Sequence, residues 1–449
     1  PVSLAPAYSD EILEGSQTFT ISNLPAGARV CLWQGDDVYT VGFAEAGGTF
    51  STTIAATAGT VKLTVVAPDA PVFTADITVN IGGGGQGGGE GGNGQDGEPD
   101  DGEPDGEDGE PELELGGNGT ANYIAYDDAG RLHFGWFDNE GACLMYALRD
   151  ATGAWSDPIV IDDSSNEVGQ YVSLALDADG NPGMAYYDAW NADLKYAHFD
   201  GAEWNTETVH SRNSTGMYPS LIYNAEGEAA IAYYNATGGL LMLAARSGAS
   251  WDIEVLDGLE SFGDGTEDVG RYPCMAVNPA TGLLAVAYEN SSVGTFKYAR
   301  QGAPDAWTTE TFDGETLGGG GYISMRFYGP DVPLISYYDA YNADLKFAVG
   351  VGDDWSASTV ASRNSQGLYT TLHIDASDDV SIVYWNKTGD CLMRADHSTG
   401  TWTFDTLVEN GGREARVAWD SNKSPGEVGY MAVTTYVSGA DALRFDALC

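Results

Sequence analysis

Basic residues are scarce in this chain. Its 449 residues include 19 lysines and arginines against 67 aspartates and glutamates, which gives a formal net charge of −48 at pH 7. A surface this acidic repels nucleic acid and anionic membranes, so neither is expected as a partner. The charge fits an exported protein, whether it reflects a saline habitat or simply keeps the protein soluble.

Cysteines are few and widely spaced. The five are Cys31, Cys143, Cys274, Cys391 and Cys449. They form no Cys-x-x-Cys pair and no zinc-ligand spacing, which excludes a disulfide-dense scaffold and leaves room for one incidental bridge. Apolar runs stay shorter than about 18 residues, so no membrane insertion is expected. The chain starts at Pro1 without a signal peptide, and we expect a mature or trimmed form of a secreted or cell-surface protein.

Aromatic and basic residues are absent from residues 83–111, which consist mainly of Gly, Glu, Asp and Pro. Such a segment cannot bury enough apolar surface to offset the entropy of ordering, so it is predicted to be an acidic linker. Its carboxylates could bind calcium, but the EF-hand spacing is absent and a solvated spacer is favoured. No other cofactor and no metal site is predicted.

Residues 1–82 contain short alternating runs such as QTFTISNL, ARVCLWQG and GTVKLTVVA, separated by turn residues. About seven strands in this length predict a small β-sandwich. The stretch from PAGARVCLWQGDD through GTVKLTVVAPDAPVFTADITV resembles the immunoglobulin-like domain that follows the catalytic domain in gingipain-type bacterial cysteine peptidases. That resemblance implies a bacterial surface or secreted protein. It implies no peptidase activity, because the peptidase domain itself is missing.

The rest of the chain is internally repeated. YYDAWNADLKYA (186–197) recurs as YYDAYNADLKFA (337–348), and HSRNSTGMYPSL (210–221) recurs as ASRNSQGLYTTL (361–372). Six aromatic anchors recur at intervals of about 50 residues, which identifies a tandem array of one structural unit. The anchors are Phe137, Tyr187, Tyr234, Tyr288, Tyr338 and Trp385. A seventh, degenerate unit begins at residue 414.

Each unit is predicted to hold four short antiparallel strands, which in the second unit are 171–177, 183–189, 193–199 and 203–209. Seven such units are typical of a seven-bladed β-propeller, here spanning 112–449, whereas solenoid repeats are usually shorter. The seventh unit has only three strands. We therefore expect residues 112–115 to add its outermost strand and so close the ring. The whole chain is predicted to be all-β.

Turns between the third and fourth strands resemble the Asp-box of sialidase-type propellers. The matching stretches are DATGAW (150–155), DGAEW (200–204), SGASW (247–251) and HSTGTW (397–402). In that family the Asp-box is structural and faces away from the active site. The chain lacks the Arg-Ile-Pro tripeptide of sialidases, and no set of catalytic arginines and carboxylates can be assigned. The resemblance therefore supports the fold and not the activity.

Candidate ligand-binding residues follow from the blade layout. The first strand of a blade is innermost, so the connections from strand 2 to 3 and from strand 4 to the next blade open on one face. Aromatic rings beside Asn, Asp and Arg on these loops suit sugars. A purely structural role stays open for each residue, because Asx residues also build turns. The candidates are Asp188, Trp190, Asn191, Arg212, Asn213, Tyr218, Asp339, Tyr341, Asn342, Arg363, Asn364 and Tyr369.

We expect a secreted or cell-surface recognition or adhesion protein that binds carbohydrate or a surface protein. One alternative is a structural subunit that self-associates into a surface layer or filament. Another is a polysaccharide lyase or glycosidase, framed by His210, Arg212 and Tyr218. However, the counterpart of His210 in the duplicated unit is Ala361, and the acidity opposes a uronate polymer. No catalytic residue is assigned, and an enzyme is not favoured.

Overall fold

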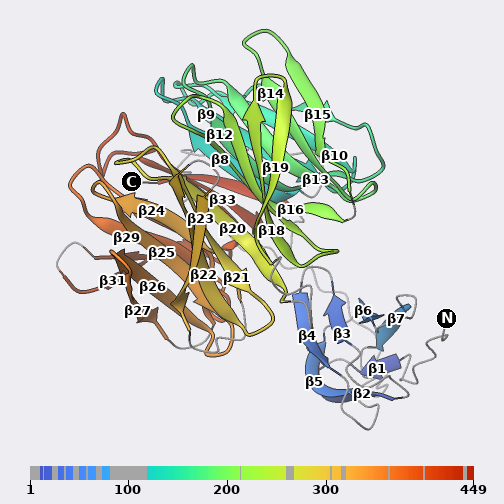
Figure 1. Ribbon diagram of the computed structural model, residues 1–449. Coiled ribbons are helices and arrows are strands. Elements are labelled where there is room, and N and C mark those ends of the chain that lie inside the picture. The colour runs from blue at the N-terminus through green and yellow to red at the C-terminus, as the bar shows by residue number, and fades with distance from the viewer. Residues whose placement is uncertain are drawn as a thin grey trace, which may run out of the picture. The chain divides into compact units, whose positions relative to one another are not determined.

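A computed structural model gives the structure of the protein (Figure 1). It describes residues 11–13, 15–22, 29–34, 37–43, 50–56, 59–66, 73–80, 119–212, 214–258, 267–303, 306–314, 320–362, 365–397, 400–437 and 442–448. The chain divides into two compact units, Pro1–Asp105 and Gly106–Cys449. The linker predicted at 83–111 and the closing strand predicted at 112–115 lie outside the described residues. No helix within the described ranges is long and apolar enough to cross a membrane.

The described residues of the first unit form seven strands, and about seven were predicted. They are β1 (Glu11–Leu13), β2 (Gly15–Ile21), β3 (Arg29–Gln34), β4 (Asp37–Phe43), β5 (Phe50–Ala56), β6 (Gly59–Val66) and β7 (Phe73–Asn80). Five of them form a sheet in the order β1-β7-β6-β3-β4, and β2 pairs with β5 in a second sheet. The immunoglobulin-like assignment of this unit stays a prediction.

The second unit is a ring of seven antiparallel sheets, or blades, and the predicted seven-bladed propeller is confirmed. Blade 1 holds β8 (Gly119–Tyr126), β9 (Leu132–Asp138), β10 (Cys143–Arg149) and β11 (Ile159–Asp162). Blade 2 holds β12 (Val168–Leu176), β13 (Pro182–Asp188), β14 (Asp193–Phe199) and β15 (Trp204–His210). Blade 3 holds β16 (Thr215–Tyr223), β17 (Ala229–Asn235), β18 (Leu240–Ser247) and β19 (Ser250–Asp257).

The remaining blades repeat this layout. Blade 4 holds β20 (Val269–Val277), β21 (Leu284–Asn290), β22 (Thr295–Ala303) and β23 (Ala306–Asp313). Blade 5 holds β24 (Ser324–Tyr328), β25 (Val332–Asp339), β26 (Asp344–Val351) and β27 (Asp354–Ala361). Blade 6 holds β28 (Gln366–Ile374), β29 (Val380–Asn386), β30 (Cys391–Asp396) and β31 (Thr403–Glu409). Blade 7 holds β32 (Arg413–Trp419), β33 (Met431–Val437) and β34 (Ala442–Leu448), the three strands predicted for it.

The innermost strands close the ring. Each first strand contacts the first strand of the next blade, and β32 of blade 7 contacts β8 of blade 1. At this junction the Asn122 side chain donates to the backbone oxygen of Glu414 (3.1 Å) and accepts from the Thr434 hydroxyl (2.6 Å). Both Asn122 and Thr434 are buried, so the bonds that join the first and last described blades are shielded from bulk solvent.

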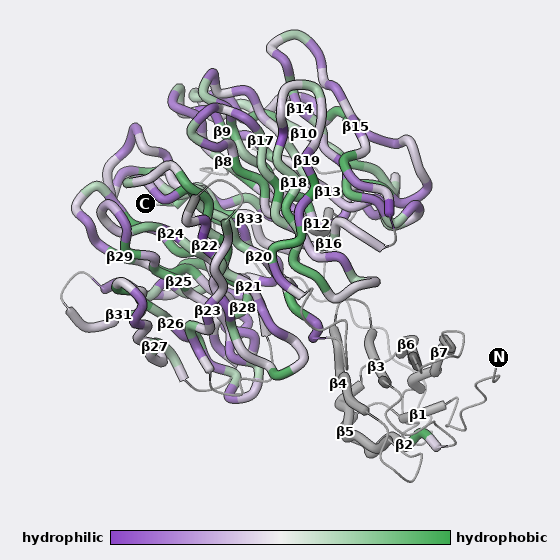
Figure 2. Tube along the Cα trace, in the orientation of Figure 1, coloured by the Kyte–Doolittle hydropathy of each residue, from purple (hydrophilic) through white to green (hydrophobic). Residues whose placement is uncertain are grey.

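Aromatic side chains fill the spaces between blades. The second strands β9, β13, β17 and β21 are buried along their whole length, because each is covered on both faces by a neighbouring blade. Figure 2 shows apolar residues concentrated along the strands and polar residues at the connections. A tryptophan near the start of the fourth strand packs edge-on against a ring from the third strand of the preceding blade. These pairs, with their centroid separations, are Trp204–Tyr146 (5.0 Å), Trp251–Tyr196 (5.3 Å), Trp355–Tyr298 (5.1 Å), Trp402–Phe347 (5.4 Å) and Trp155–Phe445 (5.3 Å).

Lysine–aspartate ion pairs cross three of the interfaces between blades, two of them buried and one partly buried. In the interface between blades 4 and 5, the Lys346 Nζ lies 2.6 Å from the Asp313 Oδ2, and the Tyr337 hydroxyl donates to the same oxygen at 2.6 Å. All three side chains are buried. The same arrangement recurs where Asp162 meets Lys195 and Tyr186, and where Asp257 meets Lys297 and Tyr288. Because the two charges share one hydrogen-bonded site, each offsets the desolvation of the other.

The lysine and the aspartate are replaced together. Between blades 2 and 3 the aspartate position holds His210 and the lysine position holds Met242, as the strand registers show. Between blades 5 and 6 the same positions hold Ala361 and Met393. A lone buried lysine would leave an uncompensated charge, so loss of the acid is matched by loss of the base. Equivalent interfaces of the ring therefore contain either a lysine–aspartate ion pair or a pair of residues without that charge.

This pairing predicts the effect of breaking one ion pair. Asp313→Ala should lower the free energy of unfolding by about 3–5 kcal/mol, because it leaves Lys346 buried and unpaired. The double variant Asp313→Ala/Lys346→Met reproduces the combination found at Ala361 and Met393, and should recover most of that loss. Denaturant unfolding measures both values. A double variant as unstable as the single one would contradict this account.

A histidine links blades 6 and 7. The ring of His373 stacks on Trp419 with centroids 4.1 Å apart, and its Nε2 lies 3.2 Å from the Tyr430 hydroxyl. Burial, followed by the nearby Arg326, lowers the pKa of His373 to about 4, and Asp375 partly opposes this shift. The imidazole is therefore neutral in the folded protein at pH values where an unfolded histidine is charged.

Stability should consequently fall as the pH drops below about 6.5, because the unfolded state then binds a proton that the folded state does not. His373→Gln should flatten the pH dependence of the unfolding free energy between about pH 4 and 6.5. At pH 8 His373 is neutral in both the folded and the unfolded state. The difference in unfolding free energy between variant and wild type should therefore no longer change with pH. Denaturant midpoints across this range test the sign, and an unchanged slope in the variant would overturn it.

Candidate functional site

The connections from strand 2 to strand 3 lie on the same face of the propeller as the connections between blades. The Ala189 amide donates to the Glu167 oxygen at 2.8 Å, and the Thr215 amide donates to the Ala192 oxygen at 3.1 Å, which joins the two kinds of connection directly. The predicted layout is confirmed for these blades. We call this side the loop face, defined by connections 139–142, 189–192, 236–239, 291–294, 340–343 and 387–390.

Asp188 stabilises its loop through hydrogen bonds to its carboxylate. Its carboxylate is 2% exposed and accepts from the Ser165 hydroxyl (2.7 Å), the Asn191 amide (3.1 Å) and the Asn191 Nδ2 (2.9 Å). Ala192 follows with φ of 61°, a left-handed conformation that turns the chain back into β14. The carboxylate replaces a backbone acceptor, as Asx residues do in turns. Asp188 thus shapes the loop from a buried position, and Asn191 is exposed while its amide groups bond to Asp188.

The duplicated loop in blade 5 has the same structure. Asp339 is 1% exposed and accepts from the amides of Tyr341 (3.0 Å) and Asn342 (3.1 Å) and from the Asn342 Nδ2 (2.7 Å). Ala343 has φ of 58°, like Ala192. Two loops three blades apart therefore share the two hydrogen bonds from the asparagine to the aspartate.

Each braced loop presents an aromatic ring to solvent. Trp190 is 64% exposed and Tyr341 is 75% exposed, and both occupy the same position of the loop. Large aromatic side chains are normally buried, so two exposed rings at equivalent sites on rigid turns have no packing role that would account for them. Their position favours contact with a ligand.

The other predicted residues fall into two groups. Arg212 is exposed between blades 2 and 3, whereas Asn213, Arg363 and Asn364 lie outside the described residues. Tyr218 and Tyr369 are partly buried and belong to an arc of tyrosines near the propeller axis. Among the predicted residues, Trp190, Tyr341, Arg212, Asn191 and Asn342 are exposed. Asp188 and Asp339 are buried where the turns that carry the two rings begin.

The arc is a feature that the sequence reasoning largely missed. Its rings contact one another in succession, at centroid separations of 4.6, 4.4, 6.0 and 4.4 Å. Residues from five successive blades can touch in this way only near the axis, where the blades converge. The members are Tyr171, Tyr218, Tyr272, Tyr322 and Tyr369, one each from blades 2 to 6.

All five tyrosines have φ between 50° and 55°. A bulky residue in this region is an outlier that costs of the order of 1–3 kcal/mol. The strand register shifts just after Tyr218, as at a β-bulge, and this turns the ring out of the blade. Gly216 precedes it with φ of 107°, and a Cβ there would lie 2.6 Å from the Leu194 Cα. The recurring Gly-x-Tyr triplet is the sequence signal that could have identified the arc.

Blade 4 departs from the repeat beside this arc. Glu289 stands where blades 2, 3 and 5 have tyrosines, and it is only 5% exposed. It accepts from the Ser291 hydroxyl (2.6 Å) and the Gly320 amide (3.2 Å), and burial raises its pKa. Arg271 lies over the ring of Tyr234 (5.3 Å) and pairs with Asp268 (3.0 Å). The guanidinium is therefore already matched by a carboxylate.

His210, which framed the lyase alternative, points into the blade interface. Its Nδ1 lies 2.8 Å from the hydroxyl of the fully buried Tyr233 and 3.1 Å from the Thr215 hydroxyl. Burial, and then Arg212, lowers its pKa. A general base must reach a proton of the substrate. The Nδ1 of His210 instead lies against the hydroxyl of Tyr233, which is buried and not accessible to a polymer.

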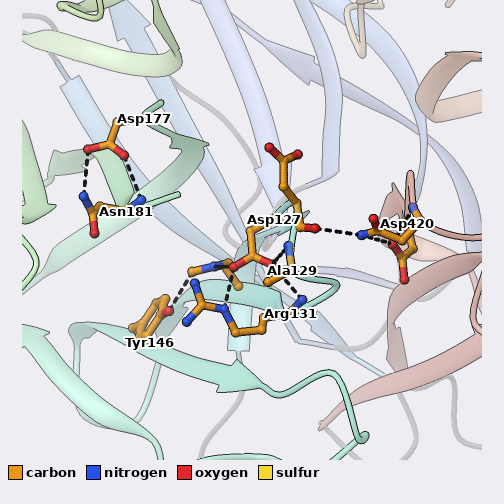
Figure 3. Close-up of polar contacts among 10 residues, drawn as sticks. Asp127, Ala129, Arg131, Tyr146, Asp177, Asn181 and Asp420 are labelled. Atoms are coloured by element: carbon orange, nitrogen blue, oxygen red, sulfur yellow. Dashed lines mark hydrogen bonds and ion pairs between the residues drawn. The ribbon is translucent and has the colours of Figure 1, made fainter. Parts of the chain in front are cut away.

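A second histidine cluster lies at the start of blade 1 (Figure 3). Asp127 accepts from the Arg131 Nε (2.6 Å) and lies 3.4 Å from the His133 Nε2, and the His133 Nδ1 lies 2.8 Å from the Tyr146 hydroxyl. His133 is 2% exposed, and burial lowers its pKa and raises that of Tyr146. A histidine, a tyrosine and an arginine meet here; the histidine and the tyrosine are buried, whereas the arginine is partly exposed. This cluster fixes the turn that joins β8 to β9.

Comparison with known proteins supports the fold and assigns the chain to no family. No family model matches the chain, and no curated protein matches it. A solved ulvan lyase bound to -[GlcA(1-4)Rha3S]- has a TM-score of 0.50 and 10% identity, covering 75% of this chain and 96% of its own. Hydrazine synthase from Kuenenia stuttgartiensis has a TM-score of 0.50 and 7% identity, covering 73% of this chain and 95% of its own. A fucose-specific lectin from Aleuria aurantia has a TM-score of 0.43 and 16% identity, covering 65% of this chain and 96% of its own. At these identities the similarity establishes a shared fold only.

The bracing role of Asp188 can be separated from binding. Asp188→Ala removes an acceptor of three hydrogen bonds and should lower the free energy of unfolding by about 1–3 kcal/mol. Hydrogen exchange at the amides of residues 189–192 should become faster. Trp190→Ala is the matched control, since loss of an exposed ring should leave both quantities nearly unchanged. Equal exchange in Asp188→Ala and wild type would contradict the bracing role.

Proposed function

We propose that this protein is a secreted or cell-surface recognition protein whose propeller binds carbohydrate on the loop face. The observation that carries the proposal is the pair of exposed rings, Trp190 and Tyr341, at equivalent positions of loops that are each braced by a buried aspartate. An indole or phenol ring offers a flat apolar surface to the face of a sugar ring, and rigid loops lower the entropy lost on binding. Polar groups beside the rings, such as Asn191 and Asn342, suit hydroxyl groups.

The electrostatics favour a neutral glycan. The net charge of −48 repels polyanions, and Arg271, the arginine nearest the arc, is already paired with Asp268. One structure of the same fold holds a bound saccharide chain, which supports the compatibility of this fold with such ligands. That lyase acts on an anionic polymer, whereas the charge of the present chain opposes one.

Binding without catalysis is the function that the described residues support best. His133 and His210, the two histidines that lie near a tyrosine and an arginine, each have the Nδ1 within hydrogen-bond distance of a tyrosine hydroxyl. His133 is buried and His210 is partly buried. The lyase alternative therefore gains no support from either histidine.

A glycan array of the full chain, followed by calorimetry with the glycans it identifies, tests the proposal. Trp190→Ala and Tyr341→Ala should each weaken binding by about fivefold or more, the equivalent of roughly 1 kcal/mol of lost stacking. Tyr328→Ala is the control, since Tyr328 is 38% exposed and ends β24, away from the loop face. Absence of binding to any glycan, or equal binding by wild type and both loop variants, would refute the proposed site.

A further inference from the structure

Trp190 and Tyr341 lie on nearly opposite sides of the ring. They belong to blades 2 and 5, and seven blades divide the circle into steps of about 51°, so three steps separate the two rings by roughly 154°. A straight line between them therefore passes close to the propeller axis. Whatever bridges the two rings must cross the centre of the loop face.

The tyrosine arc occupies that centre. In the strand register, Gln170 pairs with Tyr187, which directly precedes Asp188, so Tyr171 lies close to the level at which the braced loop begins. The arc is thus on the loop-face side of the propeller. Its five members are partly exposed rather than buried, so part of each side chain is accessible to solvent.

The arc is maintained at a conformational cost that packing alone does not require. Blade 7 adopts the same backbone, with φ of 54°, but places Glu414 there instead of a tyrosine. The bulge therefore does not depend on a tyrosine, yet five successive blades supply one. Strained residues retained in one cluster are a feature of ligand sites.

The repeat is also broken where the arc is widest. Tyr272 and Tyr322 are 6.0 Å apart, against 4.4–4.6 Å for the other neighbours. Gly321 lies at this gap with φ of 64°, and a Cβ on it would come within 2.3 Å of the Tyr272 ring. Glu289, buried beside the same gap, takes the position that other blades give to an aromatic ring. The centre of the face is therefore more polar on the blade 4 side.

From this alignment we infer that the loop face binds one extended, neutral polysaccharide chain, which runs from Trp190 across the tyrosine arc to Tyr341. This inference rests on the proposed carbohydrate function and specifies the form of its ligand. The two outer rings stack on sugar units near the ends of the bound segment, and the arc hydroxyls contact the units between them. Joining two weak contacts through one chain raises the affinity by effective concentration, with no further contact needed.

Isothermal titration of the full chain with oligosaccharides of increasing length tests this arrangement. The ligands are β-1,4-linked gluco- and manno-oligosaccharides from dimers to long polymers, with oligogalacturonates as the anionic comparison. Long neutral chains should bind one per protein and at least about tenfold more tightly than short ones. Short chains should bind two per protein, one at each exposed ring.

Variants separate the bridging chain from two independent sites. Trp190→Ala and Tyr341→Ala should each weaken binding of the long chain about tenfold or more, whereas with short chains each should only remove one of the two sites. Tyr272→Phe removes one hydroxyl and keeps the ring, so it should weaken long-chain binding without affecting short chains. Tyr328→Ala should change neither.

The possible failures are distinguishable. Two long chains per protein, or equal affinity for short and long chains, would overturn the bridging arrangement while leaving carbohydrate binding intact. Tight binding of the anionic series alone would overturn the neutral-ligand assignment. Absence of binding to every oligosaccharide and every arrayed glycan would overturn both this inference and the proposed function.

Discussion

The contact between neighbouring blades is the interaction on which the rest of the propeller depends. A four-stranded sheet has two apolar faces and cannot be stable alone, so each blade must cover the next. Here the cover is an aromatic wedge, in which the tryptophan at the fourth strand of one blade packs edge-on against a ring of the preceding blade. Each such pair contributes about 0.5–1.5 kcal/mol beyond the area it buries. The pair Trp155–Phe445 carries the same contact across the junction of the first and last blades.

Repetition of this contact leaves the rest of the interface free to vary. Three interfaces add a lysine, an aspartate and a tyrosine, with the ion pair buried in two of them and partly buried in the third. Two other interfaces replace the ion pair with histidine and methionine or with alanine and methionine. Buried ion pairs are often nearly neutral for stability compared with apolar residues of similar size. This equivalence explains how both solutions coexist in one ring without distorting it.

The same reasoning separates scaffold from site. Asp188 and Asp339 recur with their partners because the turn needs them, so their repetition carries no information about a ligand. Trp190 and Tyr341 recur although the turn leaves them in solvent. Departures are equally informative: Glu289 takes a position in blade 4 that holds tyrosine in blades 2, 3 and 5, next to a cluster of strained tyrosines, where a buried charge is costly. Candidate functional residues on this propeller are therefore the ones whose presence the fold does not explain.

The spacing of the repeats was sufficient to predict seven blades and the three strands of the last one, because alternation and turn residues are local properties of a chain. It also identified the loops that carry Trp190 and Tyr341. Sequence could not show that Asp188 faces inward while Trp190 faces solvent, since the two residues are only two positions apart and one partner of Asp188, Ser165, lies in the connection from the preceding blade. Nor could it assemble the tyrosine arc, whose members are about 50 residues apart and meet only because ring closure brings five first strands to one axis.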